Sequence, residues 1–190
     1  RRARSQPPRI GAVTDLETLL HASRRAARVL AVAGTEPRRA AIRAIADAID
    51  ASVDAIVAAN AEDLERGRGT LASGLIDRLA LDADRVAALA AAARELAELP
   101  DPVGEITRAR TLDNGLELTE VRVPFGVVGA IYEARPNVTV DLACIALGSG
   151  NAIVLRGGSA AEATNAVLVA TMQRAVASVG LPAESVQTIE

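Results

Sequence analysis

The residues 133–137 carry side chains that could bind an anion and polarise a carbonyl group. They directly follow an apolar run, 126–132, that has the length of a buried strand. Because ligands bind at the carboxyl ends of the strands in open parallel sheets, this loop is a candidate site. Arg135 could hold a phosphate or carboxylate through paired hydrogen bonds, and the amide of Asn137 could donate to a developing oxyanion. The pattern equally allows a surface ion pair between Arg135 and Glu133, with Asn137 only capping the next helix.

A second candidate site is the turn Arg156-Gly157-Gly158-Ser159, which lies between a short apolar run and a helical pattern. Two glycines would let a ligand approach the backbone, and the start of the following helix would favour an anion. Arg156 adds a positive charge there. The turn lacks the GxGxxG spacing of a dinucleotide-binding loop, so an ordinary strand-to-helix turn is the other interpretation.

Cysteine, histidine and lysine usage excludes several other chemistries. The single Cys144 and the single His21 exclude a disulfide within the chain and a Cys-rich or His-based metal site, so we predict no metal. All 21 basic residues are Arg, which excludes a Schiff-base lysine and a GxxxxGK[ST] phosphate loop. Cys144 lies in an apolar stretch with no His or Lys nearby to activate it. We therefore predict that it packs in the core.

The elements that must position these loops alternate between strands and helices over residues 125–190. We expect buried strands at 126–132, 152–155 and 186–189, joined by helices at 141–147 and 160–179. This alternation predicts a parallel sheet with right-handed crossovers. Because the sequence stops within the third strand, the sheet looks unfinished.

The residues 14–100 have a helical pattern instead, preceded by a tail, 1–13, that we predict to be disordered. Thr14 and Glu17 have the spacing of a capping box. A second helix should begin at Thr35 and keep its apolar stripe to Val57. We expect a fresh cap at Asn60 and Asp63, and further helices over 71–79 and 82–99.

A β-hairpin is predicted between these two parts, within 101–124. Residues 106–112 alternate apolar and charged side chains, and 116–123 form the returning strand. Between them, Asp113-Asn114-Gly115 supplies residues that tolerate the positive φ of a tight turn.

Composition limits the possible partners. The formal charge of −3 and the presence of only two aromatic residues, Phe125 and Tyr132, disfavour a nucleic-acid-binding protein. The longest apolar run has about nine residues, half of a membrane span. The basic stretch 1–9 is not followed by an apolar signal core. We expect a cytoplasmic protein.

Several motifs of the chain resemble one enzyme family, γ-glutamyl phosphate reductase (glutamate-5-semialdehyde dehydrogenase) of proline biosynthesis. The resemblance runs from about Leu19 to the last residue, and its most specific motif is YEARPN at 132–137. The other similar segments are 59–63, 76–79, 101–104, 123–131, 138–141 and 150–159.

This resemblance implies an α/β, aldehyde dehydrogenase-like fold, here with N-terminal helices, a β-hairpin and a partial parallel Rossmann-like sheet. It also implies the reduction of L-glutamate 5-phosphate with NADPH to glutamate 5-semialdehyde, phosphate and NADP. The family's cysteine thiolate attacks the acyl phosphate, and a thioester is then reduced. That cysteine lies downstream of the part of the family that this chain resembles, so we expect the catalytic domain to be absent and the chain alone to be inactive. The hairpin belongs to the family's oligomerisation region, which implies a homo-oligomer.

The resemblance also assigns roles to individual residues. Arg156 stands where the wider superfamily usually has Lys, and Ser159 where it has Glu; these contact the adenosine ribose. Without an acid at 159, a ribose 2′-phosphate meets no like charge, which favours NADPH over NADH. The cofactor-binding residues implied are Glu133, Ala134, Arg156, Gly157, Gly158 and Ser159. Asn137 is expected to bind the acyl oxygen and Arg135 the phosphate or carboxylate of the substrate, although an insert leaves the register open and Arg135 could occupy the oxyanion position.

Two alternatives remain open. One is another aldehyde dehydrogenase, one that oxidises a semialdehyde; the other is a non-catalytic nucleotide-binding or oligomerisation fragment. A second β/α domain with a cysteine in a polar loop, encoded after Glu190, would favour the reductase.

Overall fold

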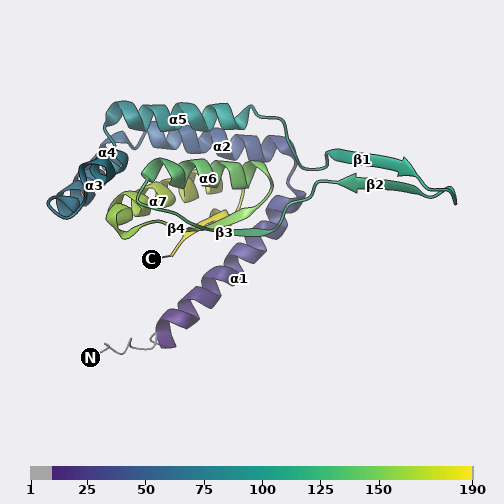
Figure 1. Ribbon diagram of the computed structural model, residues 1–190, viewed down its shortest axis with the longest axis horizontal. Helices are drawn as coiled ribbons and strands as arrows, with labels where there is room; N and C mark the ends of the chain where they lie inside the picture. The colour runs from purple at the N-terminus through teal and green to yellow at the C-terminus, as the bar shows by residue number, and fades with distance from the viewer. Residues whose placement is uncertain (1–9, 190) are drawn as a thin grey trace.

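The computed structural model describes residues 10–189, in which a block of helices precedes a small α/β unit (Figure 1). The first part contains α1 (Ile10–Val32), α2 (Thr35–Asp50), α3 (Val53–Gly67), α4 (Ser73–Leu79) and α5 (Ala83–Ala97). The hairpin consists of β1 (Ile106–Thr111) and β2 (Glu117–Val121). The last part contains β3 (Val127–Ile131), α6 (Pro136–Gly148), β4 (Ala152–Arg156), α7 (Glu162–Ser178) and β5 (Val186–Thr188), with short 3₁₀ turns at Ser159–Ala161 and Ala183–Ser185.

Helix α1 begins earlier than the sequence predicts. It starts at Ile10, so residues 10–13 of the predicted tail are helical and the remaining nine lie outside the described residues. Thr14 is inside the helix, and the capping box that we predicted with Glu17 is therefore wrong.

The predicted second helix is in fact two helices, α2 and α3, separated at Ala51 and Ser52. The apolar stripe continues across the break, because Ile49 and Ile56 are both fully buried. Hydrophobic periodicity therefore could not reveal the break. The predicted cap at Asn60 and Asp63 is also wrong for this element, since both residues lie inside α3 and are buried.

The hairpin forms as predicted, with β1 and β2 antiparallel and Thr111 opposite Glu117. Of the three predicted turn residues only Gly115 has a positive φ, 81°. Its N–H donates to the carbonyl of Leu112, which closes the turn. Every residue of both strands is exposed, and the hairpin projects away from the helices (Figure 1).

The sheet has the predicted parallel topology, with β4 between β3 and β5. Residues 152–155 of β4 are buried, as expected for a strand covered on both faces. Helix α1 packs across all three strands, while α6 and α7 pack on the side that faces α2 and α5 (Figure 1). The side chain of Gln187 on β5 ties α1 to the sheet by donating to the carbonyl of Leu19, at 3.0 Å, and to Oγ of Ser23, at 2.8 Å.

The core is continuous between the helical block and the sheet, and it is built from aliphatic side chains. Its fully buried members include Leu30, Ile45, Leu147, Leu155 and Leu168. In the described part of the chain, no helix combines the length and the apolar character that crossing a bilayer requires.

Candidate functional site

The Arg156–Ser159 turn lies at the carboxyl end of β4, where the topology predicts a ligand site. Arg156 is the last residue of β4 and pairs with Ile131 at the end of β3. A small cavity of about 160 Å³ opens there, lined by the turn and by residues 162, 165, 166, 188 and 189. Arg156 is exposed, and among residues 10–189 no carboxylate lies within ion-pair distance of it. Its guanidinium is free to bind an anion.

The two glycines of the turn are required by the protein's own packing. A Cβ atom on Gly158 would lie 2.8 Å from the backbone nitrogen of Ala134. A Cβ atom on Gly157 would overlap the side-chain amide of Asn165. The backbone of Gly158 thus lies against that of Glu133 and Ala134. This contact joins the two candidate loops. The glycines permit this close approach, whether or not a ligand binds beside them.

A buried chain of hydrogen bonds, which could not be predicted from the sequence, packs against the two loops. It consists of Tyr132, Thr139 and Asn165. The hydroxyl of Thr139 donates to Oδ1 of Asn165 at 2.7 Å. Since that hydroxyl has one proton, Tyr132 must donate in its own 2.7 Å contact with Thr139. Burial raises the pKa of Tyr132. The phenol therefore stays protonated and keeps its donor role at neutral pH.

Two N–H groups in the first turn of α7 are already bonded to a side chain of the protein. Asp63 of α3, fully buried, accepts hydrogen bonds there from the N–H of Ala163 at 3.1 Å and of Thr164 at 2.8 Å. It also accepts from the hydroxyl of Thr164 at 2.6 Å. The protein's own carboxylate thus occupies two of the N–H groups in the first turn of α7, and Arg156 is the cationic side chain that this edge offers to a phosphate. Asp63 is 100 residues away in the sequence, so no local motif marks it as the cap.

Asn60, one turn before Asp63, fixes the same corner. Its amide donates to the carbonyl of Leu79, at 2.9 Å, and to the hydroxyl of Thr164, at 3.2 Å. Its carbonyl oxygen accepts from the N–H of Leu81 at 2.7 Å. The two side chains together attach the α4–α5 connection and the start of α7 to α3.

Arg135 and Asn137 line a different pocket, of about 550 Å³, between α4, α5 and the start of α6. Arg135 is the N-cap residue of α6, and its Nη2 lies 3.8 Å from the carboxylate of Glu133, so the surface pair that we considered does form. Its Nε is buried without a hydrogen-bond partner. Asn137 is exposed and lies inside α6, so the interpretation of it as the helix cap is wrong.

Cys144 is confirmed as a core residue. It is 1% exposed on α6. Burial, and secondarily the charge of Asp141, raises the pKa of the thiol to about 12. At neutral pH the thiol is protonated and inaccessible, which is the opposite of what a nucleophile needs.

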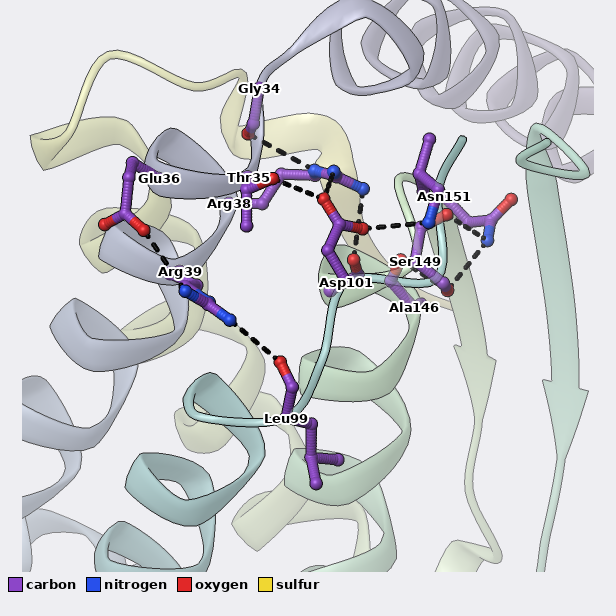
Figure 2. A network of polar contacts seen from close by, with 12 residues as sticks. Gly34, Thr35, Glu36, Arg38, Arg39, Leu99, Asp101, Ala146, Ser149 and Asn151 are labelled. Carbon is purple, nitrogen blue, oxygen red and sulfur yellow. Dashed lines mark hydrogen bonds and ion pairs between the residues drawn. The ribbon is translucent and has the colours of Figure 1, made fainter. Parts of the chain in front are cut away.

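A second buried network, also missed from the sequence, holds the base of the hairpin to the helices (Figure 2). Arg38 of α2, 3% exposed, donates to Asp101 at 2.5 Å and to the carbonyl of Gly148 at 3.1 Å. Asp101 also accepts from the hydroxyl of Thr35 at 2.5 Å and from the N–H of Val103 at 2.9 Å. These bonds join the start of α2, the end of α6 and the segment that leads into β1.

Comparison with known proteins shows similarity over nearly the whole chain. Residues 7–190 match the aldehyde dehydrogenase family. A γ-glutamyl phosphate reductase of Clavibacter michiganensis subsp. michiganensis is 60% identical over 177 residues, which are 93% of this chain and 41% of that protein. Crystal structures of the γ-glutamyl phosphate reductases of Thermotoga maritima and Saccharomyces cerevisiae superpose with TM-scores of 0.87 and 0.84, at 39% and 34% identity. They cover 92% and 91% of this chain, and 42% and 45% of those chains. The chain thus spans less than half the length of these relatives.

Proposed function

The chain belongs to the aldehyde dehydrogenase family, and from that membership we propose that it is the cofactor-binding part of a γ-glutamyl phosphate reductase. The family and the fold predicted from the YEARPN motif are confirmed. The observation that carries the specific activity is the 60% identity to a γ-glutamyl phosphate reductase over 93% of the chain. The proposed reaction converts L-glutamate 5-phosphate to glutamate 5-semialdehyde and phosphate. Because Cys144 is buried, the proposal assigns the thiolate to a part of the protein outside residues 1–190, and the chain alone would be inactive.

The nicotinamide cofactor fits the edge of the sheet at Arg156. When bound, NADPH would supply the hydride of the reaction. The unpaired guanidinium of Arg156 would bind the ribose 2′-phosphate, and Ser159 adds no negative charge beside it. Glu133, Ala134 and the two glycines would shape the contact surface. Arg156 is the cationic side chain of this turn, so it should dominate the preference for NADPH.

In the second pocket, the side chains of Arg135 and Asn137 would act on the substrate. The amide of Asn137 would donate to the acyl oxygen as negative charge develops on it. Arg135, whose guanidinium is partly exposed in this pocket, would hold the phosphate or carboxylate.

The proposed activity is tested on the intact protein that contains this segment. It should oxidise glutamate 5-semialdehyde in a reaction that requires both phosphate and NADP, followed by absorbance at 340 nm. The segment of residues 1–190 alone should show no turnover but should bind NADPH. An intact protein that binds the nucleotide without turnover would support the non-catalytic alternative instead.

The preference for NADPH predicts the effect of Arg156→Ala. We expect the KM for NADPH to rise by about tenfold, because a charge-assisted hydrogen bond to phosphate is lost, while the KM for NADH changes by less than about twofold. Arg43→Ala, which removes a half-exposed arginine of α2 that pairs with Glu98, is the control and should alter neither value. Equal losses for the two nucleotides would contradict the assignment.

The β1–β2 hairpin has the features of a surface that associates with another protein chain. Its exposed apolar side chains, which include Ile106, Leu116, Leu118 and Val121, lie on a projecting two-stranded ribbon. Isolated two-stranded ribbons are marginally stable in water, and exposed apolar side chains on them favour association. We therefore propose that the hairpin contributes to a homo-oligomer interface.

A further inference from the structure

The pocket that contains Arg135 and Asn137 also contains a carboxylate, Asp141, that the proposed function does not yet use. Asp141 lies on α6 four residues after Asn137, so both side chains are on the same face of the helix, one turn apart. Asp141 is half-buried, and among residues 10–189 it forms no ion pair. It is therefore available to a ligand.

The other charged residues of the pocket differ in how far they are already engaged. Arg85 is occupied, because it donates to the carboxylate of Asp77 at 2.9 Å and to two backbone carbonyls. Arg78 forms no ion pair within residues 10–189, and Arg135 forms only a long ion pair, 3.8 Å, with the exposed carboxylate of Glu133. Burial raises the pKa of Asp141, and no neighbouring cation lowers it. The pocket thus offers one unpaired cationic side chain, Arg78, a second that is weakly paired at the surface, Arg135, and one unpaired carboxylate, Asp141.

This set of charges is complementary to the proposed substrate. L-glutamate 5-phosphate has two anionic groups, the α-carboxylate and the acyl phosphate, and one cation, the α-ammonium group. We propose that Asp141 binds the α-ammonium group of the substrate and so selects an amino acid over other acyl phosphates. The inference rests on the proposed function and extends it to a residue that decides specificity.

The spacing along α6 agrees with this role. One helical turn separates Asn137 from Asp141, about 6 Å along the axis. Four bonds separate the acyl carbon of the substrate from its α-nitrogen, and they span about 5 Å when extended. A substrate with its acyl oxygen at Asn137 can therefore place its ammonium group beside Asp141. Arg78 and Arg135 then remain for the two anionic groups.

The experiment compares two aldehydes as substrates of the intact protein, in the oxidative direction with NADP and phosphate. One is glutamate 5-semialdehyde; the other is 5-oxopentanoate, in which hydrogen replaces the amino group. The measured quantity is the ratio of the two kcat/KM values, which does not depend on the fraction of folded protein. In Asp141→Asn the ratio should fall by about 10- to 100-fold, through the KM for the amino-acid substrate. Asp141→Glu, which keeps the charge, should recover part of the ratio.

Asp77→Asn is the matched control, since Asp77 lines the same pocket but is held by Arg85. It should leave the ratio within about twofold of the wild-type value. A wild-type enzyme that does not prefer the amino-acid substrate, or an Asp141→Asn variant that keeps the preference, would overturn the role of Asp141 alone. An intact protein that turns over neither aldehyde would instead overturn the proposed function.

Discussion

Replacing Asp63 with Ala is expected to lower the free energy of unfolding by about 3 kcal/mol, because several buried donors lose their acceptor together. Two of these are backbone N–H groups in the first turn of α7, and the third is the hydroxyl of Thr164. The N-cap residue of α7 itself, Ala161, forms no side-chain cap hydrogen bond. Urea denaturation followed by circular dichroism would measure the loss.

Two further variants separate the cap from a general effect of charge. Asp63→Asn keeps one acceptor oxygen but turns an amide towards a backbone donor, so it should lose about half as much stability. Glu162→Gln, at the exposed first residue of α7, removes a carboxylate that accepts no backbone hydrogen bond, and it should change stability by less than about 0.5 kcal/mol. A large loss in Glu162→Gln and none in Asp63→Ala would contradict the assignment of the cap.

Arg38→Met is expected to cost about 3 to 5 kcal/mol, the range found when one partner of a buried ion pair is removed. Methionine fills most of the volume of the arginine stem, but it leaves the largely buried Asp101 without its cation and the carbonyl of Gly148 without a donor. Thermal unfolding would measure the loss. Arg94→Met, which removes an exposed arginine that pairs with Asp47 and Asp50, should cost at most about 1 kcal/mol.

The Arg38–Asp101 ion pair makes the stability of the fold depend on pH in the acidic range. Burial is the strongest influence on the pKa of Asp101 and acts to raise it, but hydrogen bonds from Thr35 and Val103 and the charge of Arg38 together hold it below the usual value. A carboxylate whose pKa is lower in the folded state stabilises the fold above its unfolded pKa of about 3.9. This contribution disappears as the pH falls through the folded value. The stability difference between wild type and Asp101→Asn should therefore shrink below about pH 4.

Features of the fold that depend on local patterns could be predicted from the sequence. The apolar runs at β3 and β4 are too short for helices and are bounded by turn residues, so they predicted the parallel sheet. The hairpin followed from alternation and from Asn114-Gly115, although only the glycine adopts the positive φ. The break between α2 and α3 could not be predicted, because no glycine or proline marks it and the buried stripe runs straight through it.

The candidate site could likewise be predicted only in part from the sequence. The loops that contain Arg135 and Arg156 could be located, because both follow strands of a parallel sheet. The contacts that hold these loops in place could not be predicted, because they join residues that are far apart in the sequence. Examples are the bonds of Asp63 to Thr164 and of Arg38 to Asp101. Asn60 and Asp63 were recognised as capping residues by type, yet the helix that Asp63 caps lies 100 residues further on. Side-chain propensity predicts that a residue caps, but only tertiary structure decides which helix it caps.

The position of α1 under the sheet also sets the order in which the chain can fold. The buried face of α1, which includes Ala26 and Leu30, packs against β4 and β5, and these strands follow it by more than a hundred residues. At synthesis rates of about 5 to 20 residues per second, this face stays without its partner for about 6 s or longer. Folding therefore requires the closure of a long loop, which is slow compared with the formation of a local helical bundle. The nascent chain exposes an aggregation-prone surface until β5 is made, and the bonds from Gln187 to Leu19 and Ser23 are among the last to form.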